Sequence, residues 1–134
     1  MVVKEYGLKV NMDVEQLFSL RYTNNKMKEK PNLNYLNKIS EGSQEIKIRI
    51  VNVIKEEFTI EVTEYIINMM NNNLLNASEN VHKIRHKIGF LGMENAYDLS
   101  NEYEQNLKNN CTDLKNEFEI TLSDMYEFIK KITL

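Results

Sequence analysis

The spacing of the apolar residues is the feature that most constrains the fold. They recur every three or four positions from about residue 43 to the C-terminus. This spacing places them on one face of an α-helix and is typical of helices that pack against other helices. The 134 residues include one proline and four glycines, so few positions interrupt such helices. We therefore expect an all-α, single-domain protein, in which only residues 2–10 offer a competing strand pattern.

Four long segments carry the helical pattern, and a short one precedes them. The short segment starts near Pro31 and ends near Gly42. The long segments cover about 43–70, 74–90, 93–107 and 114–132. Short connections between long amphipathic helices predict antiparallel neighbours in an up-down four-helix bundle.

Several boundaries of these segments have local signals. The β-branched residues within 59–63 predict a bend or a loosened turn in the first long helix. Asn73 and Asn76 are equal candidates for the N-cap of the second, and Thr112–Asp113 is expected to cap the last. The asparagine run 71–73 and Gly92 are expected to end the helices before them.

Residues 1–30 form a separate N-terminal extension whose role the sequence leaves open. Asp13 is a candidate cap for a short helix that carries Val14, Leu17 and Phe18, and residues 23–30 have the polar, basic composition of a linker. We assign residues 31–134 to the bundle.

Composition excludes several classes of function. A net charge of −3 is too small and too dispersed to indicate a nucleic-acid partner. The single cysteine, Cys111, excludes an intramolecular disulfide and fits a reducing compartment. No apolar run approaches the ~20 residues that a membrane span needs, and the N-terminus lacks the apolar core of a signal peptide. We therefore expect a cytoplasmic protein with no membrane contact.

The stretch from Val81 to Met93 separates into two faces when it is placed on a helix. An apolar stripe forms one face: Ala77, Val81, Ile84, Ile88 and Leu91. The opposite face carries His82, Arg85, His86 and Gly89 at positions i, i+3, i+4 and i+7. This arrangement presents an imidazole, a permanent cation one turn away and a residue without a side chain beyond it.

This stretch resembles the signature of histidine phosphotransfer (HPt) domains, the four-helix carriers of two-component phosphorelays. The match consists of the histidine, the apolar residue at +2, the cation at +3 and the Leu-Gly pair at +9 and +10: His82, Ile84, Arg85, Leu91 and Gly92. Gly89 is usual in many members, whereas His86 departs from the small residue usual at +4. Residues 32–43 are similar to the short first helix of the family, and the likeness covers about residues 31–134.

The resemblance implies a phosphorelay carrier and not a stand-alone enzyme. Such a protein accepts a phosphoryl group from a receiver-domain aspartate and passes it to another receiver. The expected partners are response-regulator receiver domains and a hybrid sensor histidine kinase. The receiver supplies the Mg²⁺, so no cofactor is expected in this chain, which we expect to be a monomer.

Three residues take catalytic roles under this resemblance. His82 is the expected phosphoryl acceptor, because an ordinary imidazole titrates near pH ~6.5 and offers a neutral nitrogen in the cell. Arg85 is expected to neutralise the phosphoryl oxygens through its planar, always-charged fork. Glu104, at +22, matches a polar position of the family and is expected to orient the imidazole; Gln105 is the neighbouring alternative.

Four further residues are assigned to a receiver-docking surface around the histidine: Lys83, His86, Lys87 and Gly89. The lysines are suited to steering an acidic partner, although such side chains also serve simply to solubilise a helix. His86 fills space that a receiver loop would otherwise approach, so it is expected either to contact the phosphoryl group or to restrict the choice of receiver, and we favour restriction.

Two other classes of function compete with this interpretation. His82 and His86 have the i, i+4 spacing of two metal ligands on one helix face, but no third ligand is indicated. A helical bundle used only for protein interaction has the same composition. Phosphotransfer assays separate the carrier from both alternatives, and metal titration tests the first.

Overall fold

The computed structural model describes residues 29–132, and this part of the chain is helical without any strand. It contains five helices: α2 (Asn34–Ile39), α3 (Gln44–Met70), α4 (Leu74–Phe90), α5 (Glu94–Lys108) and α6 (Lys115–Lys131). The all-α class is therefore confirmed. The candidate strand at 2–10, the short helix after Asp13 and nearly all of the linker lie outside the described residues.

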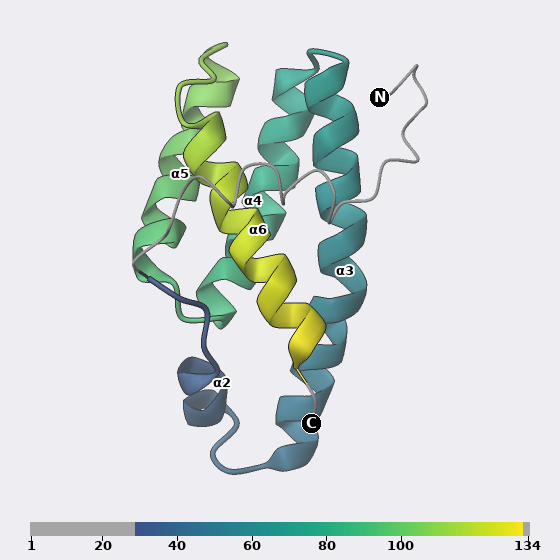
Figure 1. Cartoon of the computed structure of the whole chain (residues 1–134), viewed down its shortest axis with the longest axis vertical. Coiled ribbons are helices and arrows are strands. Elements are labelled where there is room, and N and C mark those ends of the chain that lie inside the picture. The colour runs from purple at the N-terminus through teal and green to yellow at the C-terminus, as the bar shows by residue number, and fades with distance from the viewer. Residues whose placement is uncertain (1–28, 133–134) are drawn as a thin grey trace.

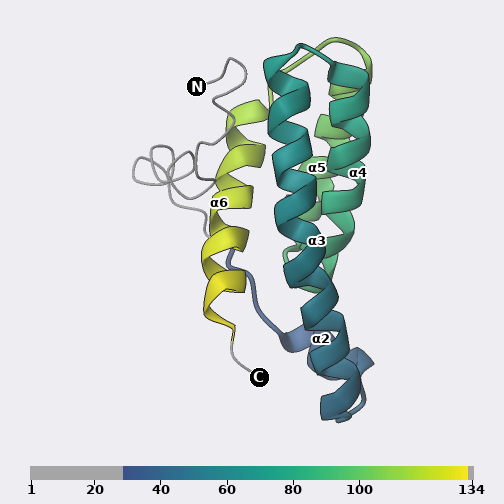
Figure 2. The ribbon, with the colours of Figure 1, turned by 90° about the vertical axis from the view of Figure 1, so that its right-hand side faces the viewer.

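The four long helices lie side by side, and α2 lies at the end of the molecule where α3 begins (Figures 1 and 2). α4 packs along both α3 and α5, and α6 contacts both α3 and α5. In Figure 1, α6 crosses in front of the other long helices at an angle. The helix that carries His82 is thus held between two neighbours.

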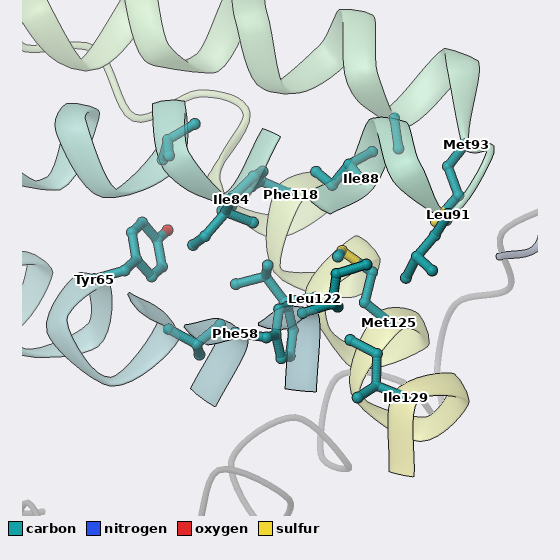
Figure 3. Close-up of a cluster of buried hydrophobic side chains, with 14 of the residues drawn as sticks. Phe58, Tyr65, Ile84, Ile88, Leu91, Met93, Phe118, Leu122, Met125 and Ile129 are labelled. Carbon is teal, nitrogen blue, oxygen red and sulfur yellow. The ribbon is translucent and has the colours of Figure 1, made fainter. Parts of the chain in front are cut away.

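All four long helices contribute large buried side chains to one hydrophobic core. Figure 3 shows how side chains from α3, α4 and α6 meet in it. The largest fully buried side chains are Tyr65, Tyr103, Phe58, Phe118, Leu36, Ile84, Ile88, Leu91, Met93, Leu107 and Leu122. Removing a fully buried side chain of this size from water typically contributes about 1.5–3 kcal/mol. The core therefore fixes which face of α4 is turned inward.

The connection from α3 to α4 shows why asparagines stand there. Asn72 has a positive φ of 55°, a backbone conformation that asparagine tolerates better than most residues. The side chain of Asn73 accepts a hydrogen bond from the backbone N–H of Asn76 at 3.5 Å. Of the two candidate caps, Asn73 is therefore the N-cap of α4.

The loosened turn expected in α3 and the cap expected before α6 were wrong, whereas the bend offered as the alternative in α3 stays a prediction. α3 is an unbroken helix through residues 59–63; the hydroxyl of Thr63 donates to the carbonyl of Thr59 at 2.8 Å, and Val62 is buried in the core. Tertiary packing therefore offsets the weak helix propensity of this turn. The cap expected from Thr112–Asp113 is also absent: the N-cap of α6 is Leu114, and no side chain caps it.

The start of α5 is held by residues that precede α2 in the sequence. The carboxylate of Glu29 accepts hydrogen bonds from the backbone N–H groups of Asn95 and Ala96, at 2.8 and 2.9 Å. Gly92 turns the chain before α5 with a φ of +75°, and a Cβ atom there would lie 2.8 Å from the Asn32 side chain. The positive φ therefore favours a glycine, and a larger residue would also have to displace the Asn32 side chain. These contacts fix α5 relative to α4, and with it the residues that face His82.

The helices of residues 29–132 include none with the length and apolar character needed to cross a membrane.

Candidate functional site

His82 lies near the middle of α4, on the side turned away from the core. The apolar stripe opposite is completely buried, as its spacing predicts: Ala77, Val81, Ile84, Ile88 and Leu91. The side chain of His82 is 48% exposed. Both of its hydrogen-bond contacts are at Nδ1, and within residues 29–132 its Nε2 atom has no partner. One edge of the imidazole is therefore open to a second molecule.

Glu104 on α5 faces the other edge of this ring. Its Oε1 atom lies 3.3 Å from Nδ1 of His82, and its side chain is only 7% exposed. Gln105, the neighbouring alternative, is exposed. The α4–α5 packing therefore brings the +22 carboxylate to the histidine, at a distance at which it can accept a hydrogen bond from Nδ1.

Arg85 does not extend into solvent; it packs between α4 and α5 with its side chain 11% exposed. Its Nη1 atom donates to Glu104 Oε1 at 2.7 Å and to Asn101 Oδ1 at 2.6 Å. Its Nη2 atom lies 3.0 Å from Nδ1 of His82, and its guanidinium carbon lies 5.6 Å from the centre of the Tyr97 ring. The cation expected to neutralise a phosphoryl group is thus held at the inner edge of the imidazole.

The charge of Glu104 is stabilised by the groups around it. Burial raises the pKa of Glu104, but hydrogen bonds from Lys108 and His82, together with the positive charge of Arg85, outweigh burial and leave this pKa below its ordinary value. Lys108 lies one turn further along α5, with Nζ 3.3 Å from Glu104 Oε2. The carboxylate is therefore ionised at neutral pH and acts as the acceptor of this cluster.

A shallow hollow opens beside His82 on the side of the first turns of α4. Its lining combines the imidazole with two lysines and two carboxylates: Leu75, Ser78, Glu79, His82, Lys83, Glu104 and Lys108. Lys83 is exposed there, close to the histidine. The hollow therefore has one exposed cation, Lys83, at the edge of the site, while Lys108 is paired with Glu104.

The other residues assigned to the docking surface differ in their placement. His86 is exposed, and its ring meets that of His82 edge to face, with the ring centres 5.0 Å apart. At Gly89 an added Cβ would lie 3.4 Å from the Tyr97 ring, an ordinary contact, so helix packing does not require a glycine. His86 and Lys83 therefore lie beside the histidine, whereas Gly89 lies two turns further along α4, next to Tyr97.

Lys87 lies elsewhere. Its side chain is buried against α3, where Nζ donates to Glu57 at 2.8 Å and to Glu61 at 3.2 Å. At about 100° per residue, Lys87 and Arg85 fall on opposite flanks of the apolar stripe, so both are partly turned toward neighbouring helices. The angular position of Lys87 on the helix was therefore a sequence signal that its side chain faces a neighbouring helix. Its assignment to receiver docking stays a prediction, which this placement disfavours.

Asn101 and Lys108 belong to the site but were not identified from the sequence. They lie three residues before and four residues after Glu104, which is the spacing that places side chains on one face of a helix. Once Glu104 is proposed to face His82, this spacing identifies both. Asn101 contacts Arg85, and Lys108 contacts Glu104.

The two histidines are not joined by a third metal-binding side chain. No group of three or more His, Cys, Asp or Glu side chains suited to hold a metal ion occurs among residues 29–132. The site is instead an exposed imidazole backed by a buried carboxylate and a partly buried guanidinium.

The chain matches no known family model, and neither a curated protein nor a solved structure shows significant similarity to it.

Proposed function

We propose that this protein is a phosphorelay carrier that accepts a phosphoryl group on Nε2 of His82 from a receiver-domain aspartate and passes it to a second receiver. In this proposal α3–α6 form the antiparallel up-down bundle of an HPt domain. Receiver domains and a hybrid sensor kinase are the partners, and the Mg²⁺ is held by the receiver.

The observation that carries the proposal is that the two edges of the His82 ring differ: one is open, and the other is contacted by side chains of the protein. Its Nε2 atom has no partner within the described residues, whereas Nδ1 faces a buried, ionised carboxylate. A carrier needs this combination, because the reacting nitrogen must be accessible and the other nitrogen must keep its proton. A solvated surface histidine has no need of a buried carboxylate behind it.

The proposed transfer step balances as follows. The lone pair of Nε2 attacks the phosphorus atom of the receiver's phospho-aspartate, the Nε2–P bond forms, and the P–O bond breaks with its electron pair going to the aspartate. The imidazole keeps its Nδ1 proton and becomes positively charged. Glu104 accepts a hydrogen bond from that N–H and offsets the charge. In the reverse direction, Nε2 is the leaving group.

Arg85 and Lys83 supply positive charge for the phosphoryl oxygens. Lys83 already lines the hollow beside His82 in this structure. Arg85 must first turn away from Nδ1 to reach the outer edge of the ring. Phosphoryl transfer depends mainly on in-line placement and charge neutralisation, which a positioned histidine and nearby cations can offer to a receiver that brings the metal.

The test is incubation with phosphorylated receiver domains from the source organism. We expect acid-labile, alkali-stable labelling of the wild-type chain and of His86→Gln, and none of His82→Gln. His86→Gln is the matched control, because it makes the same substitution one turn away on the same helix. Label retained in His82→Gln would show that another residue is the acceptor. Receiver binding without any label would identify an interaction module, and a metal titration of both variants tests the remaining alternative.

A further inference from the structure

Two groups with opposite hydrogen-bonding character compete for one atom of His82. Nδ1 lies 3.0 Å from Nη2 of Arg85 and 3.3 Å from Oε1 of Glu104. A guanidinium has only donors and an ionised carboxylate has only acceptors. A neutral imidazole presents either a lone pair or a hydrogen atom at Nδ1, so it satisfies one of these neighbours at a time.

The choice at Nδ1 decides whether Nε2 can react. When Nδ1 accepts from Arg85, the ring proton lies on Nε2, which then has no free lone pair. When Nδ1 donates to Glu104, the lone pair is on Nε2 at the open edge. Both contacts are within hydrogen-bond distance, and the shorter one, to Arg85, favours the unreactive tautomer.

Asn101 holds Arg85 in the position that makes this contact. Nη1 of Arg85 bridges Asn101 Oδ1 and Glu104 Oε1, at 2.6 and 2.7 Å, and the other arm of the fork then points at Nδ1. The Nε atom of Arg85 is buried without a hydrogen-bond partner among residues 29–132. The guanidinium is therefore oriented through its two terminal nitrogens, and Asn101 is one of the two acceptors that hold Nη1 in the described part of the chain.

We infer that Asn101 is a positioning residue: it holds Arg85 against Nδ1 of His82 and keeps the resting imidazole in the tautomer that carries its proton on Nε2. The consequence of this tautomer for phosphoryl transfer rests on the proposed function. Transfer requires Arg85 to leave Nδ1, which frees Nδ1–H for Glu104 and delivers the guanidinium to the phosphoryl group. One movement thus activates the nucleophile and supplies the charge.

The tautomer is measured directly by long-range ¹H–¹⁵N NMR of the imidazole in the full chain at about pH 8, above the range in which an ordinary imidazole titrates. We expect a protonated Nε2 in the wild type and a protonated Nδ1 in Arg85→Met, which removes the donor. In Asn101→Ala the ratio of Nδ1–H to Nε2–H should rise roughly 2- to 10-fold, the range set by one net hydrogen bond. Asn101→Asp, which keeps an acceptor, should restore the wild-type tautomer.

Asn106→Ala is the matched control, because it makes the same substitution on α5 at a side chain with no hydrogen bond in the described structure. It should leave the tautomer unchanged. A wild-type ring protonated on Nδ1, or an Asn101→Ala spectrum identical to that of the wild type, would overturn the inference. A shared amide fingerprint across the variants excludes misfolding as the cause of any change.

A transfer assay then separates this inference from the proposed function. With a phosphorylated receiver, Asn101→Ala should be labelled roughly 2- to 10-fold faster than the wild type, with unchanged receiver affinity. If no receiver labels the chain but the tautomer responds as expected, the carrier function fails and the role of Asn101 stands. If His82 is labelled but the tautomer does not respond to the substitutions, the role of Asn101 fails and the carrier function stands.

Discussion

α4 has two polar flanks that look alike in sequence and differ in the structure. On the flank toward α5, Arg85 pairs with the buried Glu104 beside the half-exposed His82. On the flank toward α3, Lys87 pairs with Glu57 and with the buried Glu61. Each flank joins a cation of α4 to carboxylates of a neighbouring helix. Only the α5 flank includes an imidazole with an open edge.

The difference separates a structural ion pair from a candidate reactive site. The charges that meet on the α3 flank are directed at each other: the ammonium group of Lys87 is turned inward to Glu57 and Glu61. On the α5 flank the ion pair lies behind His82 and determines what its inner nitrogen can do. We therefore expect substitutions on the α3 flank to change stability and substitutions on the α5 flank to change transfer.

The largest expected effect on stability comes from the α3 flank. Lys87→Ala should lower the free energy of unfolding by about 2–3 kcal/mol, because it leaves Glu61 buried without its cation. One carboxylate oxygen of Glu61 already lacks a partner within residues 29–132. Urea unfolding measures the change. The double variant Lys87→Met, Glu61→Leu should recover most of the loss, and a failure to recover would mean that the lysine contributes through packing and not through the pair.

Glu104→Gln should affect both properties on the α5 flank. We expect a loss of about 2 kcal/mol in unfolding free energy, since hydrogen bonds to a charged group are weakened. Transfer to His82 should slow about tenfold, because the charge that develops on the ring is no longer offset. Transfer kinetics and urea unfolding are measured on the same variant, with the exposed Gln105→Ala as control. Normal transfer together with reduced stability would show that Glu104, like Glu61, contributes to stability alone.

His86→Gly tests the outer face of the same flank. The imidazole of His86 lies beside His82 and takes up space that a receiver loop would approach. We expect cognate transfer to stay near normal and transfer with non-cognate receivers to become up to about tenfold faster, which corresponds to a clash of ~1.4 kcal/mol. A competition assay with several receivers measures this. A strong slowing of the cognate reaction without broader partner choice would instead place His86 in the phosphate site.

The smallest expected difference between the two flanks is in the pH dependence of stability. Hydrogen bonding to Lys87 lowers the pKa of Glu57, and the cations around Glu104 lower its pKa despite its burial. Each carboxylate therefore adds stability above its ordinary pKa of 4.5, and this contribution is lost as the pH falls through the lowered value.

Urea unfolding between neutral pH and pH values below 4.5 should show a smaller acid loss in Glu104→Gln than in the wild type. Glu57→Gln should reduce the loss less, because Glu57 is half-exposed and its charge is screened by solvent. Equal acid sensitivity in all three chains would mean that neither flank contributes to this dependence.

Much of the fold followed from local signals. The 3.6-residue period identified the helices and the inward face of α4, because burial of a continuous apolar stripe outweighs every other local preference. The asparagines at 71–73 and Gly92 marked helix ends for conformational reasons that operate within a few residues. The resemblance to the HPt signature indicated Glu104 as the partner of His82, with Gln105 as the alternative, and the structure places Glu104 at the imidazole.

Tertiary structure decided which charges became part of the site. Periodicity places a side chain at an angle around its helix, but it says nothing about what the neighbouring helix presents at that angle. Lys83 and Lys87 lie one turn apart on α4, yet one is exposed and the other is buried because α3 brings two glutamates to it. In the same way, Asn101 acquires a role only because α5 aligns it with Arg85. The sequence thus determined the helices and the exposed histidine, whereas the packing of α4 between two neighbouring helices decided what contacts the imidazole nitrogens of His82.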